Sequence, residues 1–334
     1  AKLAQQIAAA LKATLTPGER SLIERRPTQD AQAYEFYQRA KLLKQGLHAQ
    51  SVREEYDATL ALYEQAVARD PGFALAHADL VFMHGVMYWF GAIDPTPERR
   101  AKAAAALAAV QRLAPEAPET RMAQGAFAYL CENDWNKALG EFQAAAERLP
   151  NDDQVQYLLA INYRRLGRWR DAADGFERAV ALNPHDRRAA TSYIETLFDF
   201  RRFEMLPALA PRFVALFPND ASFASWFTDA QFEIDGDRNA WLRRRAAIPP
   251  LPGDTFGLGR TYGYAMQTGD LAAAEQAVAD SRQEWHGGLG GVANQPSALL
   301  RAELAAMRGD STAAKKHAEA ALAAMASRQW APRQ

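Results

Sequence analysis

Four prolines in the middle of the chain are separated by one constant interval. The four are Pro150, Pro184, Pro218 and Pro252, and each closes a stretch whose apolar residues have helical spacing. Pro71 and Pro115 occupy comparable places earlier in the chain. Because proline ends a helix readily, a constant spacing of roughly 34 residues, which we call the repeat interval, indicates a repeated unit of two helices and predicts a helical solenoid.

The segment from Asp153 to Pro184 carries the repeated unit most fully. Large and small apolar residues share the inward faces of its two expected helices: Leu159, Ala160 and Tyr163 on the first, then Trp169, Ala172, Phe176 and Ala179 on the second. Alanine lets two antiparallel helices approach closely, whereas Tyr163 and Phe176 would fill the space between neighbouring hairpins. We therefore expect both of these rings to be buried.

A unit of this length with this pattern is typical of tetratricopeptide repeats (TPRs). We predict an all-α fold, a right-handed superhelical TPR α-solenoid of about eight helical hairpins, over residues 27–330. The pattern becomes irregular after about residue 200, where Pro207 and Pro211 fall inside an expected helix and would shorten or kink it. A glycine-rich linker is expected at 287–291, and no segment has the alternation of a β-strand.

Residues 1–26 form a separate segment. One expected helix carries an apolar stripe made by Leu3, Ile7, Leu11 and Leu15. The run from Thr16 to Glu19 has the pattern that begins a second helix. We interpret this segment as linker helices at the end of an upstream domain. The chain begins with alanine and shows no secretory signal, so we expect it to be a piece of a longer protein.

The stretch from residue 7 to residue 41 resembles the junction that precedes TPRs in a group of bacterial signalling proteins. The matching residues are Leu11, Leu15, Thr16, Pro17 and Glu19, then Arg25–Thr28, then Ala33, Tyr34 and Tyr37. In those proteins a class III adenylate/guanylate cyclase or winged-helix domain is followed by a TolB-like segment and then by the repeats. The resemblance implies that this chain is the sensory or regulatory half of such a protein. It implies no enzymatic activity, because no cyclase metal-binding or nucleotide-binding motif is present.

Charge and hydropathy narrow the classes of partner. The 39 basic and 40 acidic side chains leave a net charge of -1, so the chain lacks the positive field that nucleic acid requires. No apolar run reaches the ~18 residues needed to cross a bilayer, and no membrane insertion is expected in this fragment. One cysteine excludes an internal disulfide and leaves the redox compartment open. The cytoplasm is favoured, with the periplasm as the alternative if a transmembrane helix precedes the fragment.

Candidate catalytic and metal-binding residues are few. His77 and His84 would share a helical face, but a third ligand is missing, so we expect core packing. Cys131 lacks a Cys-x-x-Cys partner and is expected to be an inert thiol. The glycines at 257, 259 and 263 lack the preceding strand of a dinucleotide loop, and Arg243–Arg245 is expected to be a solvated basic face. The sequence therefore predicts no enzyme, no cofactor and no metal site.

Partner-binding residues are expected on the first helix of each repeat. If Leu159, Ala160 and Tyr163 point into the stack, residues rotated from them by about 100° per step line the concave surface. Stepping by the repeat interval gives Phe127, Ile161, Glu195 and Asp229 as one ladder, Arg164 and Phe198 as a second, and Tyr157, Thr191 and Ser225 as a third. Trp226 sits beside Ser225 and completes the expected groove. Exposed aromatic residues rimmed by charges are typical of peptide-binding surfaces. The alternative is that these rings pack between adjacent first helices.

The sequence leaves two functions open. The first is a non-catalytic TPR scaffold that binds a protein or peptide, as the regulatory half of a multidomain signalling protein. The second is a free-standing structural scaffold or assembly factor that self-associates as a homodimer, through its groove or through the tail at Trp330–Pro332. A third class, an enzyme built on helical repeats, is disfavoured because no acid–base or nucleophile constellation emerges.

Overall fold

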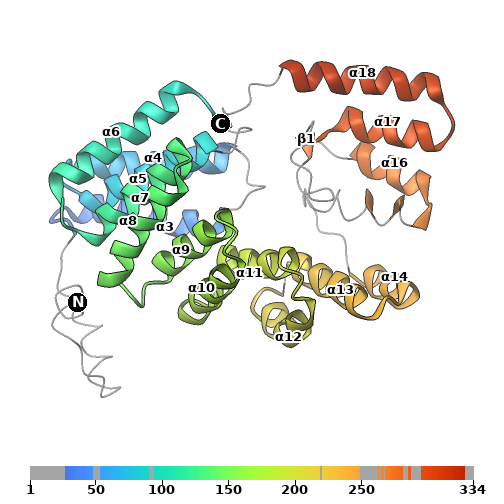
Figure 1. Cartoon of the computed structure of the whole chain (residues 1–334). Helices are drawn as coiled ribbons and strands as arrows, with labels where there is room; N and C mark the ends of the chain where they lie inside the picture. Colours follow the sequence, from blue (N-terminus) through green and yellow to red (C-terminus); the bar gives the residue numbers. More distant parts are fainter. Residues whose placement is uncertain are drawn as a thin grey trace.

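The computed structural model shows a chain built from helices that follow one another as antiparallel pairs (Figure 1). It describes residues 27–47, 53–89, 94–218, 220–248, 262–263, 265–266, 268–280, 285–286 and 295–327. Six hairpins lie between residues 31 and 246: α3 (Ala31–Gly46) with α4 (Arg53–Arg69), α5 (Ala74–Trp89) with α6 (Pro97–Leu113), α7 (Pro118–Phe127) with α8 (Trp135–Arg148), α9 (Asp153–Arg165) with α10 (Trp169–Leu182), α11 (Arg187–Asp199) with α12 (Leu206–Leu216), and α13 (Ala221–Asp235) with α14 (Arg238–Ala246). The helices predicted for residues 1–26 lie outside the described residues.

The C-terminal helices have a core of their own. α16 (Leu271–Asp280) packs with the described helical residues between 262 and 268, and α17 (Ser297–Met307) forms a hairpin with α18 (Ser311–Ser327). With the six hairpins above, the described residues account for the predicted number of about eight. None of the described helices is long and apolar enough to span a membrane.

One short pair of strands departs from the sequence expectation. β1 (Trp285–His286) pairs antiparallel with β2 (Gln295–Pro296), with Trp285 opposite Pro296 and His286 opposite Gln295. Strands of two residues have no alternation to detect, which is why the pattern search missed them. The predicted glycine-rich linker at 287–291 falls between the two strands and lies outside the described residues.

Aspartate caps fix where the first helices of the regular repeats begin. Asp152, Asp186 and Asp220 precede α9, α11 and α13, and they recur at the same repeat interval as the prolines. Each carboxylate accepts a 2.9 Å hydrogen bond from a backbone N–H in the first turn of its helix. A cap of this kind is worth ~1 kcal/mol, and it satisfies a donor that the helix itself leaves unpaired. Proline therefore ends one unit, and aspartate starts the next shortly after it.

Buried aromatic rings hold each hairpin together. Phe142 in α8 and Phe176 in α10 occupy equivalent positions, and both are fully buried. Gly125 in α7 lies so close that a Cβ atom there would stand 2.4 Å from the ring of Phe142. The hairpin of α7 and α8 can therefore close only on a residue without a side chain. The predicted burial of Phe176 is confirmed.

The expectation that Tyr163 is fully buried was wrong. Its side chain is half-buried in the last turn of α9. The guanidinium of Arg168, at the start of α10, lies 4.4 Å from the ring centroid and covers it instead of a following helix. Periodicity places a residue on a face of its helix, but it does not say how far along the helix the packed contact extends.

Two prolines shorten the second helix of the fifth hairpin, as predicted. The chain first makes a 3-10 turn at Phe203–Met205, and α12 then begins with Pro207 in its first turn, where the missing N–H costs nothing. Pro211 is inside α12 and removes one hydrogen bond of the helix. α12 has 11 residues, against 14 in both α8 and α10.

Candidate partner-binding surface

The first helices of neighbouring hairpins contact one another along the solenoid. α5 contacts α7, α9 contacts α11, and α11 contacts α13. α3 also contacts α11, although four hairpins separate their starting points in the sequence order. A row of helices whose first member meets its fifth must curve back on itself, so the first helices lie on the inside of the curve.

Eight of the nine predicted groove residues are partly exposed. These eight, which we call the inner surface, are Tyr157, Ile161 and Arg164 on α9, Thr191, Glu195 and Phe198 on α11, and Trp226 and Asp229 on α13. Phe127 is different: it is only 7% exposed and belongs to the core of the first hairpins. The guanidinium of Arg100 lies 5.7 Å from its ring centroid and seals it. Phe127 therefore packs between helices, which was the alternative to a place in the groove.

Two aromatic rings meet on the inner surface. The centroids of Phe198 and Trp226 lie 4.8 Å apart, with the ring planes inclined by 60°. Phe203, in the turn before α12, lies 5.3 Å from Phe198. Edge-to-face pairs of this kind are favourable beyond the area that they bury. The pair ties α11 to α13 and still leaves part of both rings exposed.

An ion pair joins α9 to α11 beside these rings. Arg164 Nη1 lies 3.4 Å from Glu195 Oε2, and the two side chains keep 22% and 32% of their exposure. Burial raises the pKa of Glu195, the nearby charge of Arg164 lowers it, and Asp199 raises it again. The net direction is upward. Among the described residues the ion pair of Glu195 is the long one with Arg164, and burial outweighs the charges of Arg164 and Arg187 in setting the pKa of Glu195.

Asp229 is held by residues of the last hairpin before residue 248. Its Oδ1 atom accepts a 2.8 Å hydrogen bond from Trp241 Nε1, and Arg245 Nη1 lies 3.6 Å from Oδ2. The Arg245 side chain is only 9% exposed and its guanidinium lies 5.6 Å from the Trp241 ring. The expectation of a fully solvated basic run is therefore wrong for Arg245, while Arg243 and Arg244 are exposed.

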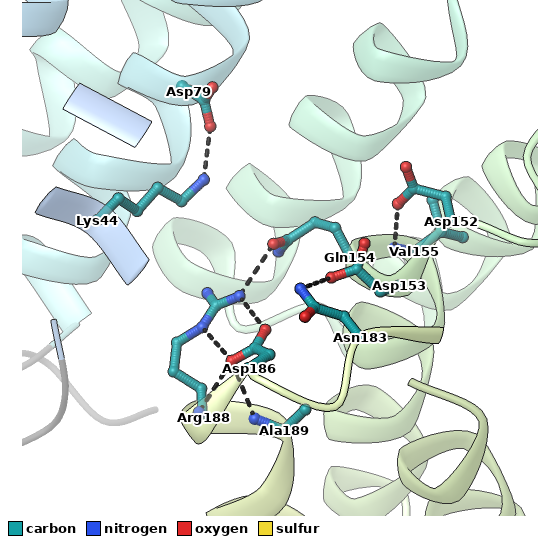
Figure 2. A network of polar contacts seen from close by, with 10 residues as sticks. All are labelled: Lys44, Asp79, Asp152, Asp153, Gln154, Val155, Asn183, Asp186, Arg188 and Ala189. Carbon is teal, nitrogen blue, oxygen red and sulfur yellow. Dashed lines mark hydrogen bonds and ion pairs between the residues drawn. The ribbon is translucent and has the colours of Figure 1, made fainter. Parts of the chain in front are cut away.

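A polar network lies at the start of α11, as Figure 2 shows. Arg188 donates to Asp186 at 2.9 Å and to Gln154 at 3.0 Å, and its guanidinium lies 4.8 Å from the ring centroid of Tyr157. The side chains of Arg188 and Asp186 are 17% and 10% exposed. Burial alone would raise the pKa of Asp186, but Arg188 holds it below the usual value. The network links the N-terminal ends of α9 and α11.

A second ion pair faces this network from the first two hairpins (Figure 2). Lys44 Nζ, on α3, lies 2.5 Å from Asp79 Oδ1 on α5 and 4.6 Å from the ring centroid of Phe82. Burial lowers the pKa of Lys44, and the charge of Arg188 lowers it further. The contact between α3 and α11 brings this ion pair toward the network of Arg188. Here paired charges of the chain itself, each 10–17% exposed, line the inside of the curve.

The repeat spacing could have predicted only some of the residues in this polar network. Gln154 and Arg188 are one repeat interval apart and each lies one helical turn before a predicted groove residue, so extending the same ladder by one turn would have found them. Lys44 and Asp79 come from the first two hairpins, whose closing prolines, Pro71 and Pro115, are not separated by the repeat interval. The approach of this pair to α11 depends on how far the solenoid curves, which local periodicity does not encode.

Among the other chemical candidates, His84 and Cys131 are buried, His77 is half-buried, and some lie outside the described residues. His84 is buried, its Nδ1 atom lies 3.1 Å from Arg99 Nη1, and burial together with Arg99 lowers its pKa to about 4. His77 is half-buried, with Nε2 3.1 Å from the Pro71 carbonyl oxygen. Burial raises the pKa of the Cys131 thiol to about 12, which suppresses its nucleophilic form. Among the described residues, no three metal-binding side chains come together. The glycines at 257 and 259 are not described.

Comparisons with known proteins identify the architecture. No protein-family model matches the chain, and no curated protein matches its sequence. The APC/C hetero-tetramer Cut9–Hcn1 is similar with a TM-score of 0.57 and 14% identity over 86% of this chain and 52% of that chain. Yeast Tom70 gives 0.55 and 12% identity over 88% and 61%, and the human IFIT1 dimer with PPP-AAAA gives 0.55 and 11% identity over 92% and 67%. At these identities the likeness concerns the fold alone: the chain is an all-α solenoid of the TPR type.

Proposed function

We propose that this chain is a non-catalytic scaffold that holds a protein or peptide segment against its inner surface between α9 and α13. The observation that carries the proposal is the pair of partly exposed rings, Phe198 and Trp226, which two successive first helices bring together. Aromatic and arginine side chains dominate the energetics of protein interfaces, and Arg164 lies on the same surface. Packing within a hairpin does not require large rings at these positions.

The curvature of the solenoid limits where a partner fits. Around Lys44 and Arg188 the inside of the curve is occupied by paired charges of the chain itself. The inner surface from α9 to α13 offers rings and charged groups that keep part of their exposure. Cut9, which has a similar fold, is known in a hetero-tetramer with Hcn1, and this precedent supports a protein partner.

The wider role that we propose is regulation of an attached signalling domain. The support is the resemblance of the N-terminal stretch, with Arg25–Thr28 and Tyr37, to the junction that precedes TPRs in bacterial signalling proteins. We expect the reading frame upstream of Ala1 to encode a class III cyclase or a winged-helix domain. Sequencing of the natural gene checks this. An upstream region of any other class would contradict the regulatory role and leave the binding role untouched.

Removal of both rings tests the binding role. Phe198→Ala combined with Trp226→Ala should weaken capture of a partner at least tenfold, ~1.4 kcal/mol, because the anchoring surface is lost. The partner is identified by affinity capture on the immobilised chain, and its dissociation constant is then measured with the purified protein. Tyr157 is left intact, because the guanidinium of Arg188 stacks on its ring.

The control is Leu182→Ala, which removes an apolar side chain that is 42% exposed at the end of α10. It should leave the dissociation constant unchanged. A partner that binds the double variant as tightly as the natural chain must use another surface. If circular dichroism shows that the double variant is unfolded at the assay temperature, the two rings belong to the core. The pair of rings then no longer supports a binding surface.

A further inference from the structure

Two pairs of carboxylates run alongside the aromatic pair. Glu195 and Asp199 lie one helical turn apart on α11, and Asp229 and Glu233 repeat this arrangement on α13, one repeat interval later. Phe198 lies within the same turn as Glu195 and Asp199, so all three share one side of α11. The repeat thus places a row of acidic groups beside two partly exposed rings.

The ion pairs along this row are long, at 3.4, 3.6 and 3.8 Å in the part of the chain that the structure describes. Asp229 is engaged by Trp241 and Arg245, as described above. In the part of the chain that the structure describes, the cation nearest to Glu233 is Arg201, at 3.8 Å. Both of those side chains are well exposed, where water and salt weaken such a pair.

The two carboxylates of α11 are the more weakly paired. The ion pair of Glu195 is the long one with Arg164, at 3.4 Å, and the pKa of Glu195 is raised because burial outweighs that partner. Asp199 is exposed, and no ion pair or hydrogen bond of its carboxylate occurs among the described residues. An incoming positive charge would therefore lower the free energy of both carboxylates, and this end of the inner surface favours a cation.

We propose that Glu195 and Asp199, together with Phe198 and Trp226, form a subsite for a peptide segment in which a lysine or arginine stands next to a bulky apolar residue. The cationic group would lie between the two carboxylates, and the apolar side chain would cover the exposed parts of the two rings. A cation near a tryptophan face gains further attraction from the ring. This subsite rests on the proposed function, since it states which segments the scaffold selects.

The same charges argue against other ligand classes. An acidic peptide or a nucleic acid would place like charges against Glu195 and Asp199, and such contacts cost binding energy. A wholly apolar segment would cover the rings and leave the carboxylates to lose water without a partner. Basic and apolar groups side by side satisfy both parts of the surface.

A random-peptide display library, panned on the immobilised full chain, tests the subsite. The natural chain should enrich peptides that carry lysine or arginine beside a large apolar residue. The variant with Glu195→Gln and Asp199→Asn keeps the shape of both side chains and removes their charge. An enriched peptide, synthesised and titrated by calorimetry, should bind this variant at least ~10-fold more weakly than the natural chain.

The matched control makes the same two chemical changes elsewhere. Asp174 and Glu177 are exposed on α10, and the variant with Asp174→Asn and Glu177→Gln should bind the peptide as the natural chain does. Enrichment of peptides without basic residues, or equal binding by the Glu195–Asp199 variant, would overturn the subsite and leave the scaffold role intact. If panning enriches no peptide at all over the bare matrix, the peptide-binding function itself fails and the subsite fails with it.

Discussion

Phe176→Ala is expected to lower the free energy of unfolding by ~3–5 kcal/mol, the cost of removing a large ring from a packed core. The Phe176 side chain is fully buried, its ring meets Tyr157 edge to face at 5.8 Å, and the Arg164 guanidinium lies 5.6 Å from its centroid. Loss of the ring therefore leaves a cavity between α9 and α10 and unsettles two residues of the inner surface. Urea denaturation followed by circular dichroism measures the change.

Tyr163→Ala is the matched comparison within the same repeat. Its ring is half-buried and partly covered by Arg168, so the loss should be ~1–1.5 kcal/mol. If both variants lower the free energy of unfolding equally, the partial exposure of Tyr163 does not reduce its contribution to stability. A loss below ~1 kcal/mol for Phe176→Ala would mean that the pairing of α9 with α10 described above is wrong.

Arg188→Met should cost ~2–4 kcal/mol of stability, because it leaves a mostly buried carboxylate without its cation. The substitution keeps most of the aliphatic stem and strands the Asp186 carboxylate, which is 10% exposed. Removing one partner of a fully buried pair costs ~3–5 kcal/mol, and the remaining exposure of Arg188 and Asp186 reduces that figure. The same change also withdraws the hydrogen bond to Gln154 on α9. Denaturation at neutral pH is the measurement.

A double-mutant cycle separates the ion pair from the rest of the arginine. Asp186→Asn can still cap α11 through its side-chain oxygen, so the double variant should lose at least ~1 kcal/mol less than the sum of the single variants. Arg178→Met, on an exposed position of α10, serves as the control and should stay within ~0.5 kcal/mol of the natural chain. If Arg188→Met behaves like this control, the network of Figure 2 does not stabilise the fold.

The sequence predicted the fold because each hairpin repeats the same short-range physics. A proline that ends one unit, an aspartate that caps the next, and alanines that let two helices approach all recur at one interval, so the unit is visible without any knowledge of its neighbours. Where that interval fails, in the first two hairpins, the positions of Lys44 and Asp79 could not be predicted.

The candidate site was predicted less completely, for a related reason. Stepping by the repeat interval gave Phe198, and Trp226 was expected only as the neighbour of a ladder position, but the structure brings the two rings together. The same spacing predicted that Phe127 would line the groove, but Phe127 is buried. Periodicity gives the direction of a side chain, and it does not show that Arg100 of the preceding hairpin covers this ring. Burial is a property of the assembled stack, so it had to come from the structure.

The contact between α3 and α11 changes how this solenoid should respond to local damage. In an open array of repeats each unit touches only its neighbours, so an end unit can unravel alone at little cost. Here the first hairpin also contacts the fifth, through α3 and α11. About 140 residues of sequence separate these two helices. The intervening hairpins therefore form a closed loop, and we expect the opening of any one of them to disturb the contact between α3 and α11. Damage inside this loop should spread through it as a single cooperative event, whereas damage beyond α13 should stay local.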